Sequence, residues 1–236
     1  MVSVVITACG RIDLLKRTID SFYDTNTYPI TEFIIVEDSG KEENHNRLRK
    51  LYPEHTLILN PKNRGQIACV DDAYSRVKTK YIFHSEDDWE YRRSGFIERS
   101  MIILETLPNI MQVWLRGVDG SHGHPIEPAM LSLENIQYRY MALLPTHDPA
   151  WHGFSFNPGL RRLGDFQKIM PLKDIGKDGV WPSGRNPGKP LPDFAVECEI
   201  GEAFYQLGLK AVTLLDEYCV HTGGQDSVYQ KQGHYK

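Results

Sequence analysis

The sequence predicts an α/β fold in which a mostly parallel sheet is flanked by helices. Through residues 1–92, short apolar runs rich in β-branched residues alternate with segments of helical periodicity. Polar residues follow these runs, as they do at the carboxyl ends of strands that face a ligand. Residues 118–195 are rich in Gly, Pro and His, which predicts loops around a few short elements. We therefore expect one domain over residues 1–236, with a Rossmann-like half over 1–92 and a less regular lobe over 93–236.

The Rossmann-like half begins with a strand and a helix. The run VSVVIT at residues 2–7 is typical of a buried parallel strand. A helix is expected next, because apolar residues then recur at helical spacing, at Ile12, Leu15, Ile19 and Phe22. The segments FIIVEDSG (33–40) and HTLILN (55–60) predict a second and a third strand in direct succession.

A glycine turn opens the next predicted helix, which apolar residues mark at Ile67, Val70, Tyr74 and Val77. The run YIFH at residues 81–84 predicts a fourth strand. In the second half, residues 95–107 predict a helix and residues 110–117 a strand. Residues 197–216 predict a helix that stops at Gly208, followed by a strand.

Composition and charge exclude several classes of function. The chain has 236 residues and a net charge of −4, so it lacks the positive charge that grips a phosphate backbone, and we do not expect a nucleic-acid partner. Its four cysteines form no CxxC pair, which argues against a structural zinc and a disulfide framework. No apolar run approaches the ~18 residues of a transmembrane helix. We expect a cytoplasmic protein and leave peripheral contact with a membrane open.

Three neighbouring carboxylates, those of Glu86, Asp87 and Asp88, follow the fourth predicted strand directly. Carboxylates this close repel one another, and burying them without partners is costly. A hard cation such as Mg²⁺ or Mn²⁺ removes this cost, since one or two carboxylates and substrate phosphates suffice to bind it. The alternative is a solvated acidic turn. The position of the cluster at the carboxyl end of a strand favours the ligand site.

Four segments, taken in order, carry a resemblance to a known family. They are VSVVITACGRIDLLKRTIDSF, FIIVEDSG, NRGQIACVDDAYSRVKTKYIFHSEDDWE and VECEIGEAFYQLGLKAV. Together they resemble GT-A type glycosyltransferases, most closely the large family 2, and the resemblance is strongest over residues 2–90. It implies a GT-A fold with a nucleotide-sugar-binding half over 1–92 and an acceptor and catalytic half over 93–236. The implied reaction is metal-dependent, inverting transfer of a sugar from a nucleoside diphosphate to a glycan, glycoside or other hydroxyl acceptor. UDP is the expected carrier, with GDP and dTDP as alternatives, and Mn²⁺ or Mg²⁺ is the expected cofactor.

The resemblance implies a metal site at Asp88, with His221, which follows the last predicted strand, as a second ligand. Asp87 and Glu86 would contact the ribose, or the metal through water. The remaining donor contacts implied by the family pattern are Thr7, Ala8, Arg11, Glu37, Asp38, Asn63, Arg64, Gly65, Gln66 and Asp72. Of these, Asp38 or its neighbour Glu37 would face the nucleobase. The alternatives are a turn-forming role for Asp38, surface pairing for Arg11 and Arg64, and plain helix exposure for Asp72.

The family's general base is the Asp of an ED pair about a dozen residues before a Gly. With Gly208 setting the register, the matching pair is Val196-Glu197, so Glu197 replaces the Asp and Val196 replaces the other acid. Glu199 is the second candidate. The alternative is that both glutamates only favour the positive end of the helix dipole.

The segment AWHGFSFNPGLRR, residues 150–162, falls where the family has its acceptor side. There Trp151 and Phe154 would stack on a sugar face, while His152 and Asn157 would bind hydroxyl groups. The alternative is that these aromatic residues belong to the core.

Two other functions compete with sugar transfer. A sugar nucleotidyltransferase needs a GxGxR loop after the first strand, and TACGRID lacks it. The other alternative is a non-catalytic nucleotide or carbohydrate binder of the same fold. It stays open because Val196 stands where the family has an acid.

Overall fold

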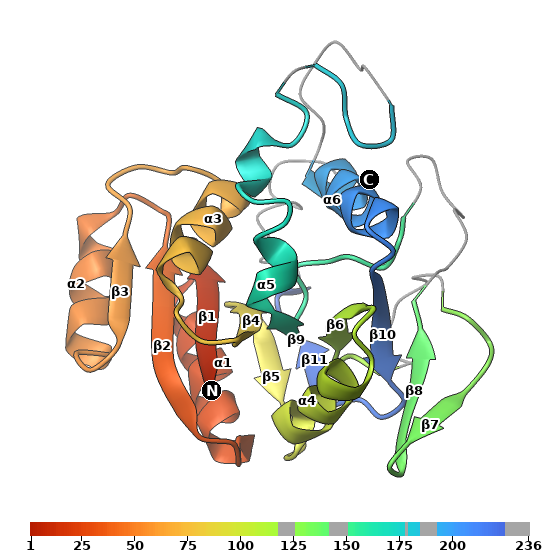
Figure 1. Ribbon diagram of the computed structural model, residues 1–236. Coiled ribbons are helices and arrows are strands. Elements are labelled where there is room, and N and C mark those ends of the chain that lie inside the picture. The colour runs from red at the N-terminus through yellow and green to blue at the C-terminus, as the bar shows by residue number, and fades with distance from the viewer. Residues whose placement is uncertain (118–125, 142–150, 178, 185–192, 225–236) are drawn as a thin grey trace.

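The computed structural model describes residues 1–117, 126–141, 151–177, 179–184 and 193–224 (Figure 1). The first half contains β1 (Val2–Ala8), α1 (Ile12–Thr25), β2 (Ile30–Glu37), α2 (Glu42–Leu51), β3 (Thr56–Leu59), α3 (Gln66–Arg76), β4 (Tyr81–Glu86) and β5 (Trp89–Tyr91). The second half contains α4 (Phe96–Thr106), β6 (Ile110–Trp114), β7 (Leu131–Leu133), β8 (Ile136–Tyr140), β9 (Gly159–Arg162), α5 (Leu163–Phe166), the 3₁₀ helix η2 (Leu172–Asp174), α6 (Asp193–Gln206), β10 (Lys210–Leu214) and β11 (Cys219–His221).

One sheet runs through both halves, and within the described residues its strand order is β3-β2-β1-β4-β9-β6-β10-β8-β7. Strands β3, β2, β1 and β4 are parallel neighbours, which confirms the parallel sheet predicted for the first half. Strand β9 lies between β4 and β6 and runs antiparallel to both. Strand β6 is parallel to β10, whereas β8 is antiparallel to β10. Only β8 and β9 therefore run against the other strands of this sheet.

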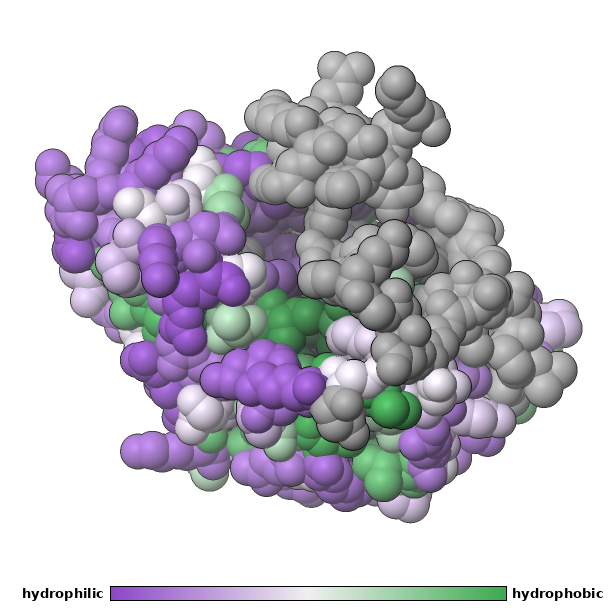
Figure 2. Space-filling model, turned by 90° about the horizontal axis from the view of Figure 1, so that it is seen from above, coloured by the Kyte–Doolittle hydropathy of each residue, from purple (hydrophilic) through white to green (hydrophobic). Residues whose placement is uncertain are grey.

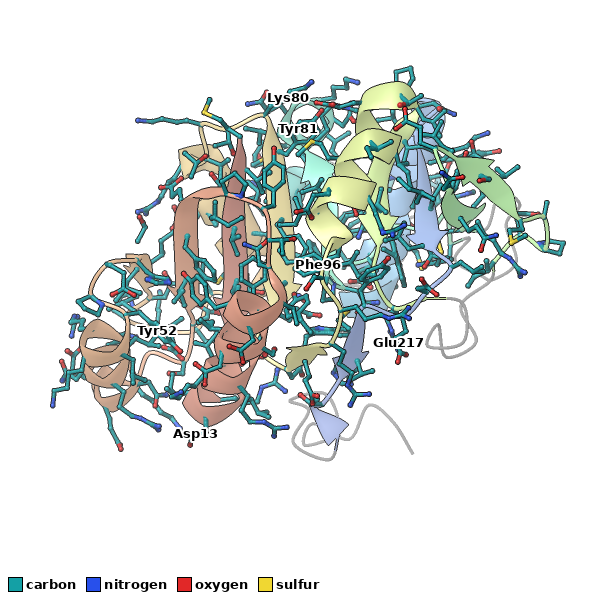
Figure 3. All side chains as sticks on the ribbon, turned by 90° about the horizontal axis from the view of Figure 1, so that it is seen from below. Asp13, Tyr52, Lys80, Tyr81, Phe96 and Glu217 are labelled. Atoms are coloured by element: carbon teal, nitrogen blue, oxygen red, sulfur yellow. The ribbon has the colours of Figure 1, made fainter. Side chains whose placement is uncertain are left out.

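Helices cover both faces of the sheet, because successive residues of each buried strand point to opposite sides. One apolar cluster contains Val4, Phe83 and the buried residues of α1 and α4. The other contains Val5 and Ile82 with the buried residues of α3, α5 and α6. Figure 3, seen from below, shows α1 and α4 side by side on the first of these faces, with Phe96 between them.

The sequence prediction missed one helix and one pair of strands. Helix α2 lies between β2 and β3, where the prediction has one strand follow the other directly. Its sequence, EENHNRLRKL, buries Leu48 together with the polar Asn44 and His45, so no apolar period marks it. Strands β5 and β11 form a separate two-stranded antiparallel ribbon that pairs Trp89 with His221. Three-residue strands are too short to show an alternation.

Gly159 shows how tightly β9 fits into the sheet. A Cβ at this position would lie 2.3 Å from the carbonyl oxygen of Val113 on β6. We predict that Gly159→Ala lowers the free energy of unfolding by about 1–3 kcal/mol, the usual cost of overpacking a core. Gly164→Ala is the matched control, because a Cβ on exposed Gly164 of α5 meets nothing within 4 Å. Urea titration should show no loss of stability for Gly164→Ala, and equal losses in both variants would contradict this account.

Candidate functional site

The predicted donor residues gather where the parallel strands end. The strand register sets Thr7 of β1 beside Glu86 of β4, and Ala8 beside Glu37 of β2. The loop from β3 to α3 crosses the top of Figure 1, so Figure 2 shows this side of the molecule from above. The surface there is hollowed beside a bank of hydrophilic residues. The three acids that end β4 lie at this side, as expected for a ligand-binding edge of an α/β sheet.

In the acidic cluster of Glu86, Asp87 and Asp88, the two aspartates are buried and paired with Arg11, whereas Glu86 is partly exposed. The Nε and Nη2 atoms of Arg11 donate to the two carboxylate oxygens of Asp87, the first over 3.2 Å. The Nη1 atom of Arg11 lies 2.8 Å from Oδ2 of Asp88. Asp87 and Asp88 are only 1% and 5% exposed, so the solvated-turn alternative does not describe these two residues. One guanidinium thus faces two buried carboxylates.

Burial, mutual repulsion and hydrogen bonds shift the pKa values of the three acids in different directions. Burial, and then the charge of Asp88, raise the pKa of Glu86 to about 7. Burial also raises the pKa of Asp87 to about 6, although Arg11 acts in the opposite direction. For Asp88, burial is outweighed by the hydrogen bond from His221 and by Arg11, so its pKa lies below the ordinary value. Adjacent buried carboxyl groups cannot all ionise freely without more cationic charge.

The β5–β11 ribbon brings His221 to Asp88, its partner in the predicted metal site. The backbone N–H of Thr222 donates to the carbonyl oxygen of Asp88 over 2.8 Å, which fixes the end of β11 against the cluster. The Nε2 atom of His221 lies 3.2 Å from Oδ2 of Asp88. This hydrogen bond raises the pKa of His221.

The arrangement of Asp88 and His221 fits a divalent cation. Two ligands of one octahedral ion with bonds near 2.1 Å stand about 3 Å apart, which matches the Asp88–His221 separation. Gly223 lies against both side chains: a Cβ there would be 2.3 Å from Oδ2 of Asp88 and 3.0 Å from Nε2 of His221. No group of three or more His, Cys, Asp or Glu side chains in the described part of the chain is arranged to hold a metal. Water and phosphate oxygens would therefore supply the remaining ligands.

Asp38 and Glu37, the predicted base-binding acids, are engaged with the protein. The carboxylate of Asp38 accepts hydrogen bonds from the backbone N–H groups of Arg64 and Gly65, at 2.8–3.0 Å, and from the side chain of Asn60 at 2.7 Å. The carboxylate of Glu37 accepts from the backbone of Gly10 at 2.8 Å and from Ser39. Both acids therefore shape the loops that follow β1 and β3.

The loop of residues 63–66 reaches the acidic cluster through Gln66, whose side-chain amide donates to Glu86 over 2.8 Å. Arg64 instead pairs with Asp72 at 3.0 Å, in the second turn of α3. These two residues line a cavity of about 400 Å³ between α3 and residues 170–173, and the acidic cluster does not border that cavity. The side chain of Asn63 donates to the carbonyl oxygen of Asp38 over 3.2 Å.

Glu197 on α6 is near enough to the acidic cluster for the charge of Glu86 to raise its pKa, whereas the hydrogen bonds of Glu199 go to Ser183. Oε1 of Glu197 accepts from the backbone N–H of Phe156 over 2.9 Å and from Ser155 Oγ over 3.4 Å. Its pKa is raised to about 7, mainly by burial and further by the negative charge of Glu86. Glu199 is fully buried and accepts two hydrogen bonds from Ser183, one of them over 2.6 Å from its hydroxyl. Glu199 thus anchors the segment around Ser183.

The four predicted acceptor residues do not form one polar surface. Phe154 is fully buried in the core and Trp151 is 5% exposed. Their burial favours the alternative that these two rings belong to the core. His152 is also buried, with Nε2 2.7 Å from Oε2 of Glu202 and its ring stacked on Tyr205. Asn157 is partly exposed. The physical reason is that this segment packs its aromatic side chains under α6.

Two residues of the site were not singled out from the sequence. Gly223 is signalled only by the pair of glycines after His221, which is a weak pattern. Arg161 stands in the GLRR run of β9, where arginine usually predicts an exposed position, yet it is fully buried.

Comparisons with known proteins identify the family to which this chain is similar. A model of glycosyl transferase family 2 matches residues 3–162. Human beta-1,4 N-acetylgalactosaminyltransferase 1 is 32% identical over 108 residues, which are 46% of this chain and 19% of the human protein. No helix in the described residues is both long and apolar enough to cross a membrane.

Solved structures share the fold at low identity. A mannosyltransferase from Pyrobaculum calidifontis, in complex with GDP-Man and Mn²⁺, gives a TM-score of 0.62 at 13% identity, covering 98% of this chain and 59% of that one. S. aureus TarS 1–349 with UDP-GlcNAc gives 0.58 at 11% identity, covering 93% and 57%. GalNAc-T7 with UDP, GalNAc and Mn²⁺ gives 0.59 at 14% identity, covering 94% and 43%. The chain thus spans less than two thirds of each, and the likeness shows the fold.

The raised pKa of Glu197 predicts that its ionisation destabilises the fold. The pKa rises from 4.5 to about 7, so stability is lost as the pH climbs through this window. At pH 8 we expect Glu197→Gln to unfold at a higher temperature than the parent. Its free energy of unfolding should be larger by up to about 3 kcal/mol. At pH 4 the two proteins should melt together. Exposed Glu43→Gln is the control and should show no such pH dependence. A variant that is no more stable than the parent at pH 8 would contradict the assignment.

Proposed function

The chain belongs to glycosyl transferase family 2 and is a glycosyltransferase, and from that premise we propose a metal-dependent, inverting transfer from a nucleotide-sugar to a hydroxyl group. The observation that carries this proposal is the meeting of Asp88 and His221 beside Gly223, from segments far apart in the chain. Glu197 faces the same cluster from α6, since its pKa responds to the charge of Glu86. A cation site and a carboxylate base on facing elements are what inverting sugar transfer requires.

In this proposal Asp88 and His221 hold Mn²⁺ or Mg²⁺, which when bound neutralises charge on the departing nucleoside diphosphate. Arg11, now paired with Asp87 and Asp88, is within reach of the same phosphates and complements their charge. Glu86, fixed by Gln66, is oriented toward the ribose.

The nucleobase would lie against the ends of β1 and β2. Thr7 and Ala8 provide backbone groups there, and Glu37 and Asp38 hold the flanking loops in shape. Asn63, Arg64 and Gly65 complete the wall, with Asp72 holding Arg64. UDP is the proposed carrier because TarS and GalNAc-T7 are solved with UDP or UDP-sugar; GDP is the alternative because the mannosyltransferase is solved with GDP-Man.

Glu197 is the proposed general base. Both of its hydrogen bonds go to Oε1, so within the described residues Oε2 accepts none and is available to take the acceptor's proton. A pKa near 7 suits a base that works at neutral pH. Of the acceptor candidates, partly exposed Asn157 is kept, and His152 is proposed to shape the acceptor side from below. Residues 1–236 acting as one domain, and a cytoplasmic location, stay predictions.

A screen of donor hydrolysis tests the reaction without knowledge of the acceptor. We expect the protein to release nucleoside diphosphate from UDP-sugars in preference to GDP- and dTDP-sugars, with Mn²⁺ or Mg²⁺ present. EDTA should abolish the release, because without a metal ion the negative charge of the leaving group is not neutralised. Undiminished release in EDTA would refute metal dependence, and inertness toward every donor would refute the transferase reaction.

Gly223→Ala sharpens the same test, since it changes no ligand. Its methyl group would occupy the space against Asp88 and His221. The affinity for Mn²⁺, measured by electron paramagnetic resonance, should fall by about tenfold or more. Gly164→Ala should bind Mn²⁺ like the parent.

The two glutamates on α6 should behave differently as bases. We expect Glu197→Gln to lower kcat by about a hundredfold or more while the affinity for UDP, measured by calorimetry, is kept. Glu199→Gln should retain turnover wherever it stays folded, because Glu199 is occupied by Ser183. The reverse order of effects would make Glu199 the base.

A further inference from the structure

Arg161 is a fully buried cation in the middle of the sheet. It lies on β9, opposite Ile82 of β4 and Gln112 of β6, and is 0% exposed. Its guanidinium lies 5.6–5.8 Å from the ring centroids of Phe154, Phe156 and Phe166. Among the described residues no carboxylate is within ion-pair distance of it, and its Nε has no hydrogen-bond partner. A buried charge without an ion pair is costly, so its retention calls for a reason.

The charge of Arg161 is met by backbone carbonyl groups. Its Nη2 atom donates to the carbonyl oxygen of Ser155 over 2.6 Å and to that of Asn157 over 3.1 Å. Its Nη1 atom donates to the hydroxyl of Tyr74 over 2.8 Å. The side chain of Gln112 donates to the same Ser155 oxygen over 2.9 Å. The segment 155–157 is therefore held from below by donors on two strands, Arg161 on β9 and Gln112 on β6.

The peptide unit between Ser155 and Phe156 joins Arg161 to Glu197. Its carbonyl oxygen accepts from Arg161, and its N–H donates to Oε1 of Glu197 over 2.9 Å. The C=O and N–H of a trans peptide point in opposite directions, and each peptide carries a dipole of about 3.5 D. The guanidinium therefore lies at the negative end of this dipole and the carboxylate at its positive end.

We propose that Arg161 is a positioning residue for the general base: it locks the Ser155–Phe156 peptide so that Oε1 of Glu197 is held and Oε2 is turned to the acceptor. The inference rests on the proposed function for the role of Glu197. It adds a residue that touches neither donor nor acceptor and lies beneath the site.

Electrostatics around Glu197 agree with this arrangement. Burial and the charge of Glu86 on β4 raise the pKa of Glu197, whereas the Phe156 hydrogen bond, the charge of Arg161 on β9 and the Ser155 hydroxyl lower it. His84 and Tyr74 are buried titratable groups next to Arg161. Burial together with the charge of Arg161 lowers the pKa of His84, whereas burial raises the pKa of Tyr74 against the opposing effect of Arg161. Arg161 is thus the cation that acts on Glu197 from within the sheet.

The test compares Arg161→Met and Arg161→Lys with Arg162→Met. Arg162 also binds backbone carbonyls, those of Pro108 and Ile110, but it reaches neither Glu197 nor residues 155–157. For Arg161→Met we expect kcat to fall about tenfold to a hundredfold with the donor KM within about twofold, because the base is misplaced. The acid limb of the kcat profile should move up by at least about half a pH unit, because a cation near the carboxylate is lost.

Arg161→Lys keeps the charge but cannot span both carbonyls, so kcat should fall while the acid limb stays near that of the parent. Arg162→Met should be less stable than the parent, but its kcat and the acid limb of its kcat profile should match those of the parent. The proposal is overturned if folded Arg161→Met keeps the kcat and the acid limb of the parent. If Arg161→Met does not fold, a kcat equal to that of the parent in Arg161→Lys overturns it.

A carboxyl ¹³C NMR titration of Glu197, assigned with Glu197→Gln, measures the same shift without turnover. An upward shift of the Glu197 midpoint in Arg161→Met supports the positioning role even if the parent transfers no sugar, in which case the proposed function alone has failed. An unchanged midpoint overturns the positioning role whatever the activity.

Discussion

The crowding of three carboxylates at the end of β4 is the constraint on which this site depends. Glu86, Asp87 and Asp88 are consecutive residues, two of them buried, and the end of the β5–β11 ribbon bonds to the backbone of Asp88. One guanidinium and one imidazole face them, which leaves the pKa values of Glu86 and Asp87 raised. A buried site with raised carboxyl pKa values favours cations, and Gly223 packs so closely against Asp88 that a side chain at this position would press on its carboxylate.

The rest of the fold supplies what that cluster needs. The parallel strands align their ends, so that Thr7 lies in register with Glu86 and Ala8 with Glu37. Buried acids such as Asp38 also hold the loops around the site in shape. The base comes from α6, in the other half of the chain, and β9 carries the cation beneath it. The reaction thereby draws on both halves of one continuous sheet.

The sequence predicted the long apolar elements of both halves, including α4, β6, α6 and β10, and missed short or polar ones, for physical reasons. Apolar runs such as those of β1 and β4 are buried on both faces, so they stand out without any alignment of homologues. Helix α2 does not stand out, because it buries polar residues such as His45. The neighbourhood of Asp88 and His221 was implied by family resemblance, but its cause, a ladder of three residue pairs, is too short to be visible in sequence. Arg161 was invisible as a site residue because arginine normally predicts solvent.

Strand β9 also has a consequence for how the chain is made. It fills the place between β4 and β6, yet it follows both in the sequence by many residues. A nascent chain that has left the ribosome only as far as β6 therefore carries two strands with bare hydrogen-bonding edges, whose natural neighbour has not been synthesised. Unpaired edges of this kind invite association with other chains. The aromatic segment just before β9, with Trp151, Phe154 and Phe156, is synthesised together with it, so the strand that closes the sheet also brings these rings to the core.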